Sequence, residues 1–210
     1  MKKLFFSLVL GIYSLSCFGA LVKGTNCGFV TVAPSVDPGG TLATMDGYNV
    51  GAKNISSSDA TSVIEIGWWK DSGPAGDLNF DVCIYAHDAG DDEPGAVIDS
   101  IQEGVSNGAG WFDVSSLSIS ISGSTTYWIG LQGEPTATIT RTNYTTDGGE
   151  QYDYNGGGTS TELPSPWGTS TASQGRLITL YAVYTTGAVE RRIIMITKYN
   201  LKFGVNVLGG

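Results

Sequence analysis

Apolar and polar residues alternate along most of this chain with the period of two that is typical of β-strands. In the segment 62–70, even-numbered residues such as Ile64 and Trp68 are predicted on one face of a strand, and odd-numbered residues such as Val63 and Trp69 on the other. The segment 78–86 repeats the pattern, with apolar residues at every even position. Successive side chains of a strand point to opposite faces, so each such run can bury one face against a core.

Turn-forming Gly, Pro, Asn and Asp clusters separate these runs, and none of the runs has the period of a helix. The sequence predicts an all-β fold, an antiparallel, jelly-roll-like β-sandwich of about nine strands. A content of 30 glycines with only 15% charged residues agrees with many short strands joined by tight turns. The predicted strands are 29–32, 41–52 as one or two strands, 62–70, 78–86, 96–102, 111–114 followed by an alternating run at 117–121, 125–132, 137–144 and 176–185, with one further short strand at 150–154.

Three regions are predicted: a signal peptide at 1–20, the sandwich at 21–187, and a basic apolar segment at 188–210. The leader has two lysines, an apolar run and small residues where a peptidase would cut, which indicates secretion. Lipid attachment at Cys17 is an alternative. The apolar run is too short to span a bilayer comfortably, so no transmembrane segment is expected after the leader is removed.

The net charge of −9 includes +2 from the leader and +3 from residues 190–210, so the residues between them carry −14. An acidic body argues against nucleic acid as a partner. It is compatible with calcium, with neutral sugars, or with the basic segment of another copy of the chain.

The segment 188–210 combines four basic residues with strand-forming side chains. One interpretation is a hairpin that packs on its own sandwich. The other is a strand donated to a neighbouring copy, which would make the protein a structural subunit of an extracellular filament or surface assembly.

Cys27 and Cys83 are the two cysteines outside the leader. In an exported protein they can form a disulfide that fixes the first strand to the core. The alternative is a pair of buried thiols that act as small apolar side chains.

Catalytic motifs are missing: the sequence has no G-x-S-x-G, no H-E-x-x-H and no Walker A motif. His87, the single histidine, ends a predicted strand beside an acidic loop and is interpreted as a surface residue. We therefore expect no enzyme.

The loop after His87 is acidic and is the first candidate for a metal site. Carboxylates and carbonyl oxygens in one loop can supply the six to eight ligands that Ca²⁺ prefers. A solvated turn held by its Asp side chains is the alternative. The candidate ligands are Asp88, Asp91, Asp92 and Glu93, with a second and weaker group at Asp147, Glu150 and Asp153.

Aromatic residues supply two candidate ligand sites. If their strands share a sheet, Trp69, Tyr85 and Trp128 would line one sheet face together with Glu65 and Asp81. Filling the core is the alternative role of these rings. The rival site is the long loop 145–174, because long loops in compact domains are often functional. Its aromatic candidates are Tyr152, Tyr154 and Trp167.

The order of the runs "SVIEIGWWKDSG", "NFDVCIYAHDAGDDEPGAVI", "GWFDVSSLSISISGSTTYWIGLQ" and "LITLYAVYT" resembles jelly-roll modules of secreted bacterial proteins. Those modules include carbohydrate-binding modules and lectin-like domains. The resemblance implies a sandwich, often a structural calcium, and ligand binding by aromatic residues. We expect an extracellular non-catalytic binding module whose ligand is a glycan or cell-surface polymer, with the structural subunit as the alternative.

Overall fold

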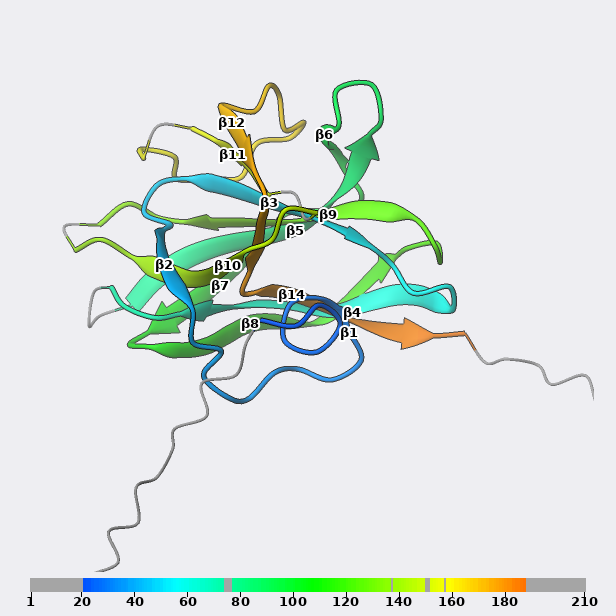
Figure 1. The fold of residues 1–210 in the computed structure, drawn as a ribbon, viewed down its shortest axis with the longest axis horizontal. Helices are drawn as coiled ribbons and strands as arrows, with labels where there is room; N and C mark the ends of the chain where they lie inside the picture. Colours follow the sequence, from blue (N-terminus) through cyan, green and yellow to red (C-terminus); the bar gives the residue numbers. More distant parts are fainter. Residues whose placement is uncertain (1–20, 74–76, 137, 150–151, 157, 188–210) are drawn as a thin grey trace, which may run out of the picture.

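The computed structural model describes residues 21–187, except 74–76, 137, 150–151 and 157. The predicted signal peptide and the basic segment 188–210 therefore lie outside the described residues. The all-β prediction is confirmed, because the described part of the chain contains fourteen strands and no helix (Figure 1). Within these residues nothing helical is available to cross a membrane.

The strands form three sheets. The four-stranded sheet has the order β1-β14-β4-β8, with bounds Gly28–Val30, Leu180–Thr186, Ala60–Lys70 and Gly110–Ser120. The seven-stranded sheet has the order β12-β11-β3-β9-β5-β6, with bounds Ala172–Gln174, Tyr152–Asn155, Asn49–Ile55, Thr126–Gly133, Asp77–Asp88 and Glu93–Val97, and β7 (Gln102–Asn107) also pairs with β5. The three-stranded sheet has the order β13-β10-β2, with bounds Arg176–Ile178, Arg141–Thr146 and Thr41–Thr44.

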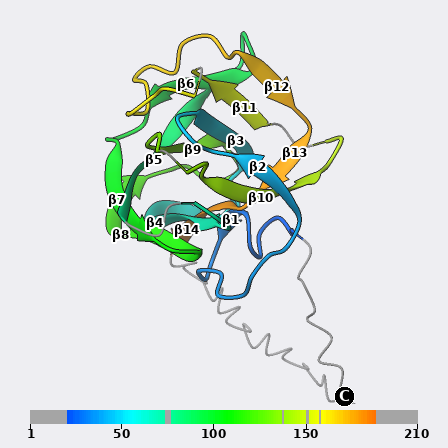
Figure 2. The ribbon, with the colours of Figure 1, turned by 90° about the vertical axis from the view of Figure 1, so that its left-hand side faces the viewer.

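The two larger sheets pack face to face around the main core. Trp68 from β4 meets Phe80 from β5 edge to face, with ring centroids 5.8 Å apart. Val82 and Ile129 are buried beside them. The three-stranded sheet lies at the side of this sandwich (Figure 2) and adds Ile178 to the same core. Burial of a large aliphatic or aromatic side chain contributes about 1.5–3 kcal/mol, so this core is the main source of stability.

A bulge in β4 changes the predicted faces of that strand. The register against β8 shifts between Val63 and Glu65. Val63, Ile66 and Trp68 are consequently buried, whereas Ile64 is 37% exposed. The prediction that Ile64 shares a face with Trp68 is therefore wrong, because a bulge inserts one residue and reverses the alternation beyond it.

The strand count of about nine was too low. The predicted strand 96–102 is in fact two strands, β6 and β7, joined by the turn between them. β6 begins at Glu93 and includes Pro94 and Gly95. Proline and glycine normally mark turns, so the pattern placed the start of this strand too late.

Cys27 and Cys83 are not bonded to each other in this structure, and both are buried. Cys27 directly precedes β1 at the edge of the four-stranded sheet. Cys83 lies in β5 and packs with Tyr85 and Trp128 on the side of the seven-stranded sheet that faces away from the main core. Burial raises the pKa of the Cys83 thiol, so it stays protonated.

Candidate binding pocket

The outer face of the seven-stranded sheet is covered by the segment 158–171, which we call the strap. Its Trp167 packs edge to face on Tyr85, with ring centroids 5.3 Å apart. The Tyr85 hydroxyl donates to the Pro164 carbonyl at 2.6 Å. Trp128 is also fully buried in this cluster. The predicted binding surface on the sheet face is therefore not formed. Part of the long loop 145–174, the alternative predicted site, covers Tyr85 and Trp128.

Two glycines make room for the side chains packed on this face of the sheet. Gly51 of β3 and Gly130 of β9 are direct partners across the ladder. A Cβ at Gly130 would lie only 2.7 Å from Cε2 of Tyr85. A Cβ at Gly51 would lie 3.7 Å from the Trp167 ring and 3.0 Å from Cγ of Pro94. These positions form a hollow in the sheet surface that leaves space for the Tyr85 ring beside Gly130 and for Pro94 beside Gly51.

Carboxylates of the sheet hold the strap by hydrogen bonds. The Ser170 amide donates to Oε2 of Glu93 at 3.1 Å, and the Ser170 hydroxyl donates to Oδ2 of Asp153 at 3.1 Å. The Leu163 amide donates to Oδ2 of Asp81 at 3.1 Å. Three acidic residues that the sequence offered as binding candidates therefore have a structural role.

Trp69 and Glu65 lie in the other sheet. Trp69 packs on Trp111 with centroids 5.5 Å apart, and Trp111 packs on Tyr181 at the same distance. The Tyr181 hydroxyl donates to Oε1 of Glu65 at 2.7 Å. The indole N–H of Trp111 donates to the Val36 carbonyl. The predicted binding surface requires Trp69, Tyr85 and Trp128 to share one sheet, and they do not.

The acidic loop is the β5–β6 hairpin. Asp92 forms an ion pair with Lys53, and Oδ1 of Asp88 accepts the Gly90 amide at 2.9 Å. His87 accepts the indole N–H of Trp128 at Nδ1, at 3.2 Å. These contacts fix the conformation of the hairpin and the orientation of the His87 ring.

The structure places Asp91 and Glu93 in the same hairpin, beside residues 166–169 of the strap. Oδ1 of Asp147 accepts the Gly149 amide, and Glu150 lies outside the described residues. Among the residues that the structure describes, no three His, Cys, Asp or Glu side chains are grouped so as to hold a metal ion. Calcium binding stays a prediction.

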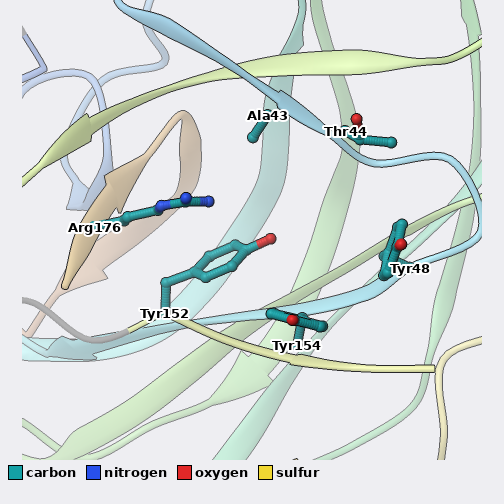
Figure 3. Close-up of a pocket in the computed structure, with 6 residues that line it drawn as sticks. All are labelled: Ala43, Thr44, Tyr48, Tyr152, Tyr154 and Arg176. Atoms are coloured by element: carbon teal, nitrogen blue, oxygen red, sulfur yellow. The ribbon is translucent and has the colours of Figure 1, made fainter. Parts of the chain in front are cut away.

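A pocket of about 180 Å³ opens between the three-stranded sheet and the adjoining edge of the seven-stranded sheet (Figure 3). We call it the tyrosine pocket. It is lined by Ala43, Thr44, Tyr48, Tyr152, Tyr154 and Arg176. Two of the predicted ligand-binding residues, Tyr152 and Tyr154, thus lie here, whereas Trp167 belongs to the strap and packs on the other face of the seven-stranded sheet.

Strand register explains why these side chains meet. Tyr152 and Tyr154 of β11 pair with the core residues Ala52 and Val50 of β3, so their rings extend the inner face of the seven-stranded sheet. In the three-stranded sheet, Arg176 is paired with Thr146, two residues beyond Tyr144. Arg176 and Tyr144 therefore project from the same face, toward the tyrosines.

The guanidinium of Arg176 is stacked between two rings. Its Cζ lies 4.0 Å from the centroid of Tyr144 and 5.8 Å from that of Tyr152. Such cation–π contacts contribute about 0.5–2 kcal/mol each. Tyr48 and Tyr154 meet edge to face at 5.8 Å on the other side of the pocket. The pocket is thus lined by aromatic rings and by one cationic side chain, Arg176.

Burial raises the pKa of the Tyr152 hydroxyl, and the positive charge of Arg176 opposes that rise. The hydroxyl is therefore neutral across the physiological range and can donate a hydrogen bond. Thr44 adds a hydroxyl at the exposed rim. The pocket thus offers flat apolar rings, neutral hydroxyls and a guanidinium.

Sequence reasoning missed Tyr48, Tyr144 and Arg176. Arg176 begins the predicted strand 176–185, and the strand pattern assigns it no further role. The signal available was a rare cation in an acidic body, at the end of a tyrosine-rich region. Its stacking partners lie in strands whose pairing the sequence does not reveal.

No family model, no curated protein and no solved structure matches this chain. The resemblance to carbohydrate-binding modules and lectin-like domains thus stays a prediction from the sequence, and the case for a function depends on the pocket itself.

Proposed function

We propose that this protein is an extracellular, non-catalytic binding module that holds a glycan in the tyrosine pocket. The observation that carries the proposal is the meeting of Tyr48, Tyr152 and Tyr154 around a stacked Arg176. Sugars present flat C–H faces that pack on aromatic rings, and their hydroxyls need polar partners placed at the rim. Both requirements are met by residues from three different parts of the chain.

The size of the pocket limits the ligand. Its volume of about 180 Å³ is below the roughly 300 Å³ at which drug-sized sites begin. A single sugar unit, at the end of a chain or projecting from one, suits this space better than a longer segment. The polymer beyond that unit would extend over the exposed rim at Thr44.

The described lining of the pocket also differs from that of a typical glycosidase site. Glycoside cleavage generally uses two carboxyl groups on either side of the bond. The described residues that line the pocket include neither a carboxylate nor a histidine. His87 is engaged with Trp128 on the far side of the seven-stranded sheet.

Isothermal titration calorimetry with a panel of plant and bacterial cell-wall oligosaccharides tests the proposal. Tyr48→Ala should weaken the binding of a positive ligand by about tenfold, equivalent to about 1.4 kcal/mol, because one stacking ring is lost. Tyr184→Ala is the matched control, since Tyr184 is another half-buried ring packed on the main core and lies outside the pocket. A panel without any ligand, or equal loss in both variants, would contradict the proposal.

A further inference from the structure

Arg176 is unusual in its charge environment. Residues 21–187 hold nineteen acidic residues and five basic ones, Lys23, Lys53, Lys70, Arg141 and Arg176. Lys53 is paired with Asp92, and Lys70 is fully buried. Arg141 is exposed, and it alternates to the face of β10 opposite Tyr144. Arg176 is thus the basic side chain that lines the pocket.

The guanidinium keeps its hydrogen-bonding edges available. Its Cζ lies over the Tyr144 ring, 4.0 Å from the centroid, and the five N–H groups of a guanidinium point outward in its own plane. No carboxylate of the described residues forms an ion pair with Arg176. Asp147, just after β10, instead accepts the Gly149 amide. Among the described residues, this arginine faces the pocket without an ion-pair partner, so a ligand carboxylate would have N–H groups to accept from.

The energies favour a charged ligand over a neutral one. A hydrogen bond to a charged group is about twice as strong as one between neutral groups. A carboxylate can also take two parallel N–H bonds from one guanidinium. Half-burial between rings strengthens this contact, because less water competes for the N–H groups.

We infer that the tyrosine pocket selects a sugar unit that bears a carboxylate, such as a uronic acid, with the carboxylate on Arg176 and the ring on the tyrosines. This inference rests on the proposed function and adds the ligand class. The charge of −14 on residues 21–189 repels a densely charged polyanion at long range. Short or sparsely acidic glycans are therefore the expected ligands.

Matched pairs of oligosaccharides that differ only at C6 test the inference on the full chain. Calorimetry would compare galacturonate, glucuronate and mannuronate trimers with the galactose, glucose and mannose trimers of the same linkage. For at least one pair, the acidic member should bind tenfold or more tightly. If a neutral trimer binds and no acidic member is preferred, the inference is wrong and the proposed function stands. If no trimer binds, acidic or neutral, the inference is contradicted, and the proposed function then depends on the wider cell-wall panel.

Substitution of single arginines tests which residue is responsible for the preference for acidic trimers. Arg176→Gln should abolish the difference between acidic and neutral trimers, and Arg176→Lys should retain part of it because the charge stays and the planar fork is lost. Arg141→Gln makes the same charge change on an exposed site and should keep the full difference. A preference that survives Arg176→Gln would overturn the assignment. Should Arg176→Gln fail to fold, the pairwise comparison on the unaltered protein still decides.

Discussion

Asp81 shows how the acidic surface affects stability at the level of one residue. Its side chain is buried in the outer face of the seven-stranded sheet and accepts the Leu163 amide. Burial raises the pKa of this carboxyl, the Leu163 hydrogen bond opposes the rise, and the negative charges of Glu103, Glu162 and Glu134 add to it. The folded protein therefore binds the Asp81 proton more tightly than the unfolded chain does.

The coupling between proton binding and folding gives the direction in which stability changes with pH. When the folded pKa lies above the unfolded one, the contribution to stability is full at low pH and is lost as the pH rises through the folded pKa. Asp81→Asn keeps an oxygen for the Leu163 amide and removes the charge. We expect a higher thermal midpoint at neutral pH than for the unaltered protein, and a smaller difference in mildly acid solution.

Asp99→Asn, at an exposed position of the loop between β6 and β7, is the control and should leave the midpoint almost unchanged at both pH values. A lower midpoint of Asp81→Asn at neutral pH would contradict this account of Asp81.

Single residues also mark the limit of what the sequence could reveal. Alternation predicts correctly that Trp68 and Trp69 point to opposite faces. It could not predict the bulge after Val63, which reverses the face of Ile64. Nor could it show that Gly51 and Gly130 are partners, because the hollow they form exists only when β3 and β9 are adjacent.

At the scale of elements, Trp167 is the largest buried side chain of the strap. Trp167 is fully buried, so Trp167→Ala should lower the free energy of unfolding by about 3–5 kcal/mol. Urea denaturation followed by circular dichroism measures the change. A loss below about 1 kcal/mol would show that the strap contributes little to the fold.

The glycine hollow makes a separate prediction for the same element. Gly130→Ala places a methyl 2.7 Å from the Tyr85 ring and 3.1 Å from the Cys83 sulfur, so the cluster has to shift. We expect a loss of about 1–3 kcal/mol in the same urea experiment.

Gly148→Ala is the matched control, because a Cβ there meets nothing within 4 Å. It should change the stability by less than about 0.5 kcal/mol. Equal effects at both glycines would mean that the hollow does not constrain the sheet.

The elements themselves were largely predictable, but their arrangement was not. Strong alternation located β4, β5 and β9 nearly in full. The region 145–174 has few aliphatic residues, and its pattern does not indicate that part of it lies over the sheet as a strap. The parallel pairing of β1 with β14, from opposite ends of the domain, leaves no local pattern at all.

At the scale of the whole molecule, the tyrosine pocket depends on distant parts of one chain. Its lining residues lie between Ala43 and Arg176, and the main core closes within the described residues. Deleting residues 188–210 should therefore leave glycan affinity unchanged, within about twofold, by calorimetry. Sedimentation of the same variant tests the alternative of a donated strand, because a structural subunit would lose its assembly.

The location of the ligand is the central claim. Tyrosine-labelled protein, titrated with the positive oligosaccharide and followed by NMR, reports on each ring separately. Shifts should be confined to Tyr48, Tyr144, Tyr152 and Tyr154, the rings at or beside Arg176. Shifts at Tyr85 or Tyr181 instead, under the strap or on the opposite sheet, would contradict the account.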